Sequence, residues 1–184
     1  MFRRRFITLI FLFAGIYLQA QNSHLSLGGY AGIPIGNSSP YYKYQFGLDA
    51  LYLTDASRTF RFGFATGFSY AVGEFYHKDF EDFVEEFQTS NFAYVPLAVS
   101  GRFVLGDFFV GADVGYAVSV TGKKAFNPNG GFYFRPKFGY DFELFKVFFS
   151  SSNVFVRQPN PTDYATSRHG IGFYAVNVGI EYNF

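Results

Sequence analysis

Apolar and polar residues alternate with a period of two along most of the chain, and residues typical of turns separate the alternating segments. Such alternation is typical of β-strands with one apolar and one polar face. In the second segment it puts both Tyr42 and Tyr44 on the apolar face. A run of serines at 150–152 blurs the seventh segment. The predicted strands are 23–36, 42–54, 58–73, 92–105, 108–120, 132–142, 147–157 and 170–184.

The connections between these segments alternate in length. Three are short, at 55–57, 106–107 and 143–146, and four are longer, at 37–41, 74–91, 121–131 and 158–169. An outer-membrane barrel with both chain ends in the periplasm has short periplasmic turns and longer outer loops. The pattern therefore predicts an all-β fold, a transmembrane up-and-down antiparallel β-barrel of eight strands.

The residues of the polar face decide between a membrane barrel and a soluble one. A soluble eight-stranded barrel such as a lipocalin also alternates, but it turns its polar face to water. Here that face is rich in glycine, alanine and serine, which suit the narrow lumen of eight strands better than a water-facing strand. The opposite face carries many of the Phe and Tyr residues, and aromatics make up 23% of the chain. This distribution favours lipid outside and a tightly filled lumen inside.

Outside the unclear seventh strand, charged residues fall on the polar face, namely Lys43, Asp49, Arg61, Arg102, Asp113, Arg135, Lys137, Asp141 and Glu181. Placing a Lys or Arg on the lipid face costs roughly 2–4 kcal/mol at the bilayer midplane, so this placement fits a membrane barrel. Six of the charges fall at similar depth, three basic and three acidic. We expect them to form a mutually paired cluster that fills the lumen; separate ion pairs with water are the alternative. The cluster is Asp49, Arg61, Arg102, Asp113, Lys137 and Glu181.

Residues 1–20 have the features of a secretory signal peptide: three arginines at 3–5, an apolar run at 6–18, and a cleavage site after Ala20. An uncleaved anchor helix is the alternative. The remainder, 21–184, is predicted to be a single outer-membrane barrel domain. Without the leader, 12 basic residues face 14 acidic ones, a net charge of −2, which gives no reason to expect nucleic acid as a partner. The chain has no cysteine, which excludes a lipoprotein anchor.

The last predicted strand ends with Ile180, Tyr182 and Phe184 on one face. This ending resembles the carboxy-terminal signal by which outer-membrane barrels engage the barrel assembly machinery. The chain as a whole resembles small outer-membrane barrels of the OmpA/OmpX-like class. The segment 92–103, with Pro96-Leu97 after a long second outer loop, is similar to a strand of the PorT-like barrel family common in Bacteroidota. That family includes a component of a secretion system, so the resemblance implies fold and location more than activity.

The long connection at 74–91 has apolar residues at helical spacing. It predicts a short amphipathic helix at the barrel mouth, formed around Tyr76, Phe80, Phe83, Val84 and Phe87. Acidic residues between them form a predicted outer-loop patch that could bind divalent cations bridging to lipopolysaccharide; a solvated face is the alternative. The patch is Glu81, Asp82, Glu85 and Glu86.

Candidate chemistry is sparse. The spacing of His24 and Ser26 is seen in outer-membrane lipid A deacylases, but here it falls on the predicted lumen face with no assigned acid. Ser167 and His169 fall in a predicted loop with nothing to orient a base against a nucleophile. No metal-ligand spacing or phosphate-binding glycine loop is present. We therefore expect no catalytic, metal or cofactor site.

The expected function is that of a non-enzymatic integral outer-membrane protein with a largely filled lumen, and a structural or interaction role through its outer loops. Its expected partners are outer-membrane lipid and lipopolysaccharide, the assembly machinery during insertion, and a protein of unknown identity. The alternatives are a narrow pore for small solutes, an accessory barrel of a secretion system, and an outer-membrane lipid-modifying enzyme.

Overall fold

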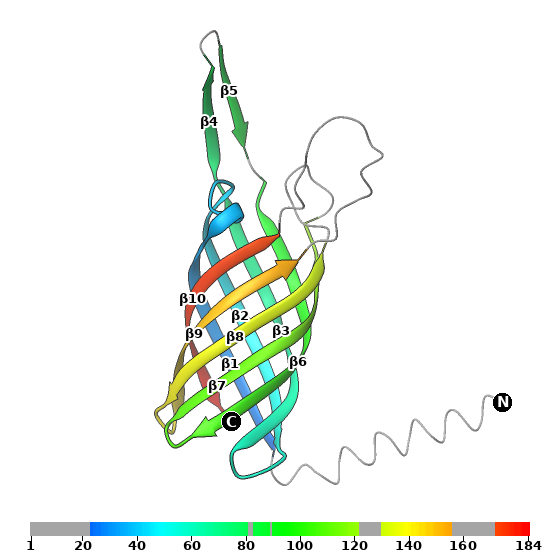
Figure 1. Ribbon diagram of the computed structural model, residues 1–184, viewed down its shortest axis with the longest axis vertical. Coiled ribbons are helices and arrows are strands. Elements are labelled where there is room, and N and C mark those ends of the chain that lie inside the picture. Colours follow the sequence, from blue (N-terminus) through cyan, green and yellow to red (C-terminus); the bar gives the residue numbers. More distant parts are fainter. Residues whose placement is uncertain (1–22, 81–82, 89, 122–129, 156–171) are drawn as a thin grey trace, which may run out of the picture.

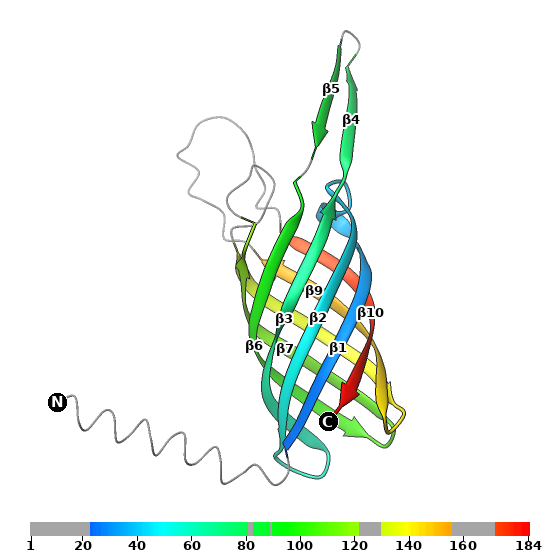
Figure 2. The same cartoon turned by 180° about the vertical axis from the view of Figure 1, so that it is seen from behind.

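The computed structural model describes residues 23–80, 83–88, 90–121, 130–155 and 172–184. Eight strands form a closed barrel in which every strand pairs antiparallel with its neighbour and β1 pairs with β10 (Figures 1 and 2). This confirms the predicted eight-stranded up-and-down barrel. The strands are β1 (Ser23–Pro34), β2 (Tyr42–Asp55), β3 (Phe60–Gly73), β6 (Phe92–Leu105), β7 (Phe108–Ser119), β8 (Gly131–Asp141), β9 (Phe145–Phe155) and β10 (Phe173–Asn183).

The two ends of the barrel differ. The terminal end holds the start of β1, the end of β10 and the short turns after β2, β6 and β8, whereas the loop end holds the longer connections (Figure 1). At the loop end a 3-10 turn, η2 (Gly36–Ser38), is held against β10. The Ser38 hydroxyl donates to the carbonyl of Gly172 at 3.0 Å and accepts from the amide of Tyr174 at 2.8 Å. No helix among the described residues is long and apolar enough to cross a bilayer.

The helix predicted in the 74–91 connection is wrong, because this segment forms a β-hairpin. Strands β4 (Phe75–Phe80) and β5 (Phe83–Gln88) pair with each other and project beyond the loop end (Figure 1). Their register sets Tyr76 opposite Phe87 and Lys78 opposite Glu85. Aromatic residues favour strands, and this segment contains several. The local spacing that favours a helix does not take these cross-strand pairs into account.

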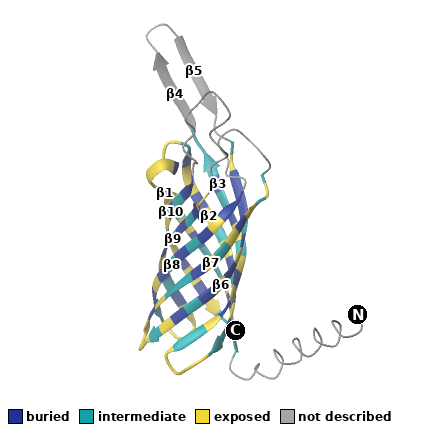
Figure 3. Cartoon of the chain, turned by 45° about the vertical axis from the view of Figure 1, so that its right-hand side comes forward, coloured by how far each residue is buried: buried dark blue, intermediate teal, exposed yellow. Residues whose placement is uncertain are grey.

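Buried and exposed residues alternate along the eight barrel strands (Figure 3). The exposed positions carry large apolar side chains on every strand, for example Leu48, Phe64 and Phe149, each more than 60% exposed. Tyr42 departs from the predicted alternation, because its ring is only 2% exposed and lies inside. The cause is a register shift between Tyr42 and Tyr44 in the pairing of β2 with β3. An extra residue in one strand reverses the side to which the next side chain points.

The irregular seventh strand, β9, has a structural explanation. The register between β8 and β9 pairs Phe134 with Asn153 and Lys137 with Ser150, and is interrupted between these pairs. Pro136 lies at the interruption and has no N–H to donate to the ladder. The side-chain amide of Asn153 donates to the backbone carbonyls of Ser151 at 2.8 Å and Phe134 at 3.0 Å. This polar side chain therefore supplies the donor that proline lacks.

Replacing Asn153 with leucine is expected to lower the free energy of unfolding by about 1–3 kcal/mol, since a carbonyl in an apolar setting loses its partner. The substitution should cost much less in a Pro136→Val background, where the valine N–H restores the ladder bond. Urea titration of barrels refolded in detergent micelles measures both losses. Equal losses of unfolding free energy in the two backgrounds would contradict the inference that Asn153 supplies the donor that Pro136 lacks.

Candidate functional site

The most distinctive polar feature of the described residues is a group of six charged side chains inside the lumen. They come from five strands, and each residue is at most 4% exposed. Three are acidic and three are basic, so their formal charges cancel. We call this group the charge network; it consists of Asp49 (β2), Arg102 (β6), Asp113 (β7), Arg135 and Lys137 (β8) and Glu181 (β10).

Ion pairs cross the lumen within the charge network. The Arg135 guanidinium bridges β2 and β7, at 2.9 Å from Asp49 Oδ1 and 3.0 Å from Asp113 Oδ2. Lys137 Nζ lies 3.1 Å from Asp113 Oδ2 and 3.4 Å from Glu181 Oε1. Arg102 donates to Glu181 at 2.8 Å. Each buried charge thus has an opposite charge within reach, which offsets the cost of removing it from water.

Each cation of the charge network also lies over an aromatic ring. Arg102 lies 4.1 Å from the ring centroid of Phe109, Arg135 lies 5.2 Å from that of Tyr30, and Lys137 lies 5.2 Å from that of Phe148. A cation over a ring face is stabilised by the ring quadrupole, more strongly where water is excluded. The rings therefore stabilise the three cations in addition to the carboxylates.

Glycines make room for these three rings. The strand register sets Tyr30 opposite Gly47 and Gly179, and sets Phe148 opposite Gly179 and Gly139. Gly139 is in turn opposite Phe109. A Cβ atom added at Gly47 would overlap the ring of Tyr30, and one added at Gly179 would overlap that of Phe148. Part of the glycine-rich lumen face is thus one row in which aromatic residues and glycines alternate.

The structure brings together five of the six charges predicted to cluster, namely Asp49, Arg102, Asp113, Lys137 and Glu181. Arg61 lies apart from them, because it faces the terminal end and its Nε lies 2.9 Å from Asp55 Oδ1. The register places Arg61 directly opposite Arg102, and like charges in that position repel.

Arg135 occupies the place in the charge network that the prediction gave to Arg61. It is on the polar face of its strand and pairs with Asp113 in the β7–β8 register. That cross-strand pair could have indicated it from sequence, once the hairpin register was fixed.

A second polar group lies at the terminal end. His24 Nε2 is 3.3 Å from Asp55, and the Ser26 hydroxyl donates to Asn183 at 2.8 Å. Lys146 donates to Asn183 at 2.7 Å and lies 3.3 Å from Asp141. His24 and Ser26 therefore have separate partners.

Aromatic rings fill the lumen near the loop end. The ring centroid of Tyr42 lies 5.4 Å from that of Phe173 and 6.2 Å from that of Phe92. Tyr94 packs below them, 5.2 Å from Phe92 and 6.1 Å from Tyr133. All five residues are at most 2% exposed.

The other predicted features are the acidic patch, the leader and the assembly signal. Glu81 and Asp82 fall outside the described residues, whereas Glu85 and Glu86 lie in β5 with Lys78 and His77 as register partners. The described residues contain no group of three or more side chains able to hold a metal ion. The predicted leader, 1–20, is likewise outside the described part of the chain. The predicted assembly signal, Ile180, Tyr182 and Phe184, is exposed at the end of β10.

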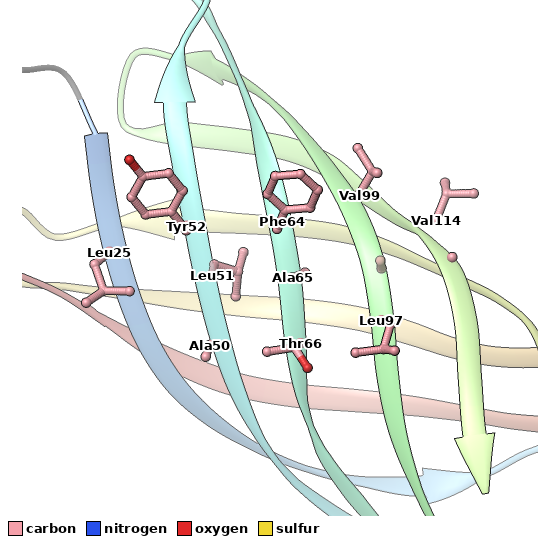
Figure 4. A pocket seen from close by; sticks show the side chains of 12 residues that line it. Leu25, Ala50, Leu51, Tyr52, Phe64, Ala65, Thr66, Leu97, Val99 and Val114 are labelled. Atoms are coloured by element: carbon pink, nitrogen blue, oxygen red, sulfur yellow. The ribbon is translucent and has the colours of Figure 1, made fainter. Parts of the chain in front are cut away.

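The outward wall carries an apolar groove of about 490 Å³ (Figure 4). The register pairs Ala50 with Thr66, and in Figure 4 these small side chains lie below the rings of Tyr52 and Phe64, with Leu97 beside Thr66. No charged residue lines the groove. Apart from the hydroxyls of Tyr52 and Thr66, its lining side chains are apolar.

Comparison with known proteins gives little beyond this description. Among solved structures, the chain is similar to Ail, the attachment invasion locus protein of Yersinia pestis. The two align over 89% of this chain and 99% of that chain, with 11% sequence identity and a TM-score of 0.49. No family model matches the chain. No curated protein matches it. The assignment of the fold therefore rests on the strand pairing itself.

Proposed function

We propose that this chain is a non-enzymatic integral protein of the outer membrane, with a filled lumen and a structural or interaction role. The observation that carries the proposal is the inside-out arrangement of the barrel. Large apolar side chains cover the outward face of all eight strands, while the charge network is buried inside. In water such a surface would be a severe aggregation hazard, whereas in lipid it is the stable arrangement.

The dimensions of the strands support this placement. They are 11 to 14 residues long, and a tilted strand needs about 9–11 residues to cross the hydrocarbon core. Aromatic rings gather outside near the terminal end. The ring centroid of Tyr140 lies 4.9 Å from that of Phe108 and 4.6 Å from that of Phe142. Aromatic girdles of this kind mark the membrane interface of barrels. We assign the terminal end to the periplasm and the loop end to the outside.

A folded barrel of this kind should resist detergent until it is boiled. On a gel, the membrane-extracted protein is expected to migrate differently before and after heating, because the closed ladder of β1 to β10 keeps the unheated barrel compact. Identical migration of heated and unheated samples would refute the membrane barrel.

The filled lumen makes a separate prediction. In this proposal no continuous aqueous path crosses the barrel. Ion pairs block the middle of the lumen. The rings of Tyr42, Phe92 and Phe173 block it near the loop end. Single-channel recording on the purified protein in planar bilayers is expected to show no large stable conductance. A stable open level would favour the narrow pore instead.

The interaction role rests on the β4–β5 hairpin, which projects past the loop end as a two-stranded ladder (Figure 2). An isolated two-stranded hairpin is marginally stable in water, so a binding partner would stabilise it. Crosslinking from the hairpin in intact cells, compared with a variant lacking residues 75–88, tests this role. A crosslink to a secretion-system component would favour the accessory-barrel alternative. Lipid, lipopolysaccharide and the assembly machinery are further proposed partners.

A further inference from the structure

We propose that the groove on the outward wall binds one acyl chain of an anionic phospholipid, and that the phosphate of this lipid contacts Arg58. The inference rests on the proposed membrane location and deepens it, since it assigns one lipid of the periplasmic leaflet to a defined site. The rest of the outward wall is expected to contact only lipids that exchange freely.

A step in side-chain size along β2 and β3 forms the groove. Ala50 lies opposite Thr66 in the register, and two residues nearer the terminal end Tyr52 lies opposite Phe64. In Figure 4 the two rings stand side by side above the small pair, and Leu97 closes the row beside Thr66. No charged side chain lines this depression, so an apolar chain loses no polar contact on entering it.

The length of the groove suits a single acyl chain. One edge is a continuous row of register partners on five neighbouring strands, from Leu25 on β1 through Tyr52, Phe64 and Val99 to Val114 on β7. Neighbouring strands lie about 4.8 Å apart, so this row is about 19 Å long. One leaflet contributes about 15 Å of hydrocarbon, and a chain that lies obliquely along the wall covers somewhat more.

The groove opens toward the terminal end, which we assign to the periplasm. Tyr52 lies three residues before the end of β2 at Asp55. Its hydroxyl points in the direction in which β2 runs, toward the terminal end (Figure 4). Tyrosine rings typically lie at the membrane interface with the hydroxyl toward the headgroups. The turn after β2 is therefore at the level of the headgroups of the periplasmic leaflet.

Charge at the terminal end favours an anionic headgroup at this turn. Arg58 lies in the turn after β2, is exposed, and forms no ion pair with another described residue. The carboxylate of Asp55 is already paired with Arg61 at 2.9 Å. The turns after β6 and β8 instead carry Asp107 and Glu143. A phosphate is thus attracted to the hairpin that bears the groove and repelled by the other two turns.

Photocrosslinking of the full chain in vesicles of phosphatidylglycerol with a diazirine in one acyl chain tests the groove. We expect the labelled peptides to concentrate on β2 and β3. Ala50→Leu should lower this labelling at least about fivefold, because the added side chain fills the site. Ala31→Leu is the matched control, since it makes the same change at an exposed position of β1 outside the groove. Even labelling of all eight strands, or equal effects of the two variants, would overturn the proposal.

A second pair of variants tests the headgroup. Arg58→Gln should lower the labelling in phosphatidylglycerol about fivefold, the usual effect of one basic residue at an anionic membrane surface, but not in phosphatidylcholine. Lys43→Gln removes an exposed charge near the loop end and should change neither. A loss with Lys43→Gln in place of Arg58→Gln would assign the lipid to the other leaflet and overturn the proposal.

The same samples separate failure of the lipid site from failure of the membrane barrel. Even labelling of a barrel whose gel migration still changes on heating would refute the lipid site alone. A crosslink between two chains through β2 and β3 would show a second copy in the groove and would also refute the lipid. Identical migration before and after heating would instead refute the proposed membrane barrel.

Discussion

Replacing Arg135 with methionine is expected to lower the free energy of unfolding by about 3–5 kcal/mol. Methionine keeps much of the length of the side chain but removes the charge. Asp49 and Asp113 would then share Lys137 as their remaining cation in the charge network, at 3.8 Å and 3.1 Å. The lumen would hold an uncompensated buried carboxylate, which is the costly outcome of breaking a buried ion pair.

Arg61→Met is the matched control for this experiment. Arg61 also pairs with an aspartate, but its side chain is 23% exposed and that of Asp55 is 32% exposed. Water screens such a pair, so we expect a loss of less than about 1 kcal/mol. Urea-dependent folding into lipid vesicles, followed by gel mobility, measures both variants. Similar losses for Arg135 and Arg61 would mean that the charge network contributes no more to stability than a rim ion pair.

The second large effect is expected from a single methyl group. Gly179→Ala should lower the free energy of unfolding by about 1–3 kcal/mol, the usual cost of overpacking. The new Cβ would overlap the Phe148 ring and lie 2.8 Å from the carbonyl oxygen of Gly29. Phe148 would have to move, and with it the ring on which Lys137 lies. The same folding titration measures the loss.

Gly29→Ala provides the control on the outward face of the neighbouring strand. A Cβ atom there would meet nothing closer than 3.6 Å, so the substitution should be neutral or slightly stabilising. Shortening the ring with Phe148→Leu should recover part of the loss caused by Gly179→Ala, since the two sites are in contact. If Gly29→Ala were as harmful as Gly179→Ala, the loss would reflect strand propensity rather than ring packing.

The strands were predictable because each has an outward apolar face and a lumen face, which imposes a strict period of two on the sequence. The predicted bounds 92–105 coincide with β6, and the predicted start of β7 at Phe108 is also correct. The start of β3 was predicted two residues early, since the turn after β2 extends to Thr59. A turn of polar residues has no alternation to mark where it ends.

The depth of each charge was harder to predict than its face. The face to which a side chain points depends on its position along one strand. Its depth in the barrel depends on the stagger of all eight strands. Counting from the terminal end put Arg61 level with Arg102, and the register does pair them. Counting residues along a strand could not show that the Arg61 side chain would turn toward Asp55. Nor could it show that Arg135 would reach both Asp49 and Asp113. The helix prediction at 74–91 failed for a related reason, since spacing along one segment does not show which residues pair across β4 and β5.

The charge network has a consequence for barrel assembly. Glu181 lies on the last strand, and its partners Arg102 and Lys137 lie on β6 and β8. Both cations lack this carboxylate until β10 is in place beside β1 and β9. A slip of β10 by two residues would keep every side chain on its correct face but move Glu181 away from both cations. Ion pairing thus distinguishes the native shear from its nearest competitor, whereas the outward apolar pattern is the same in both.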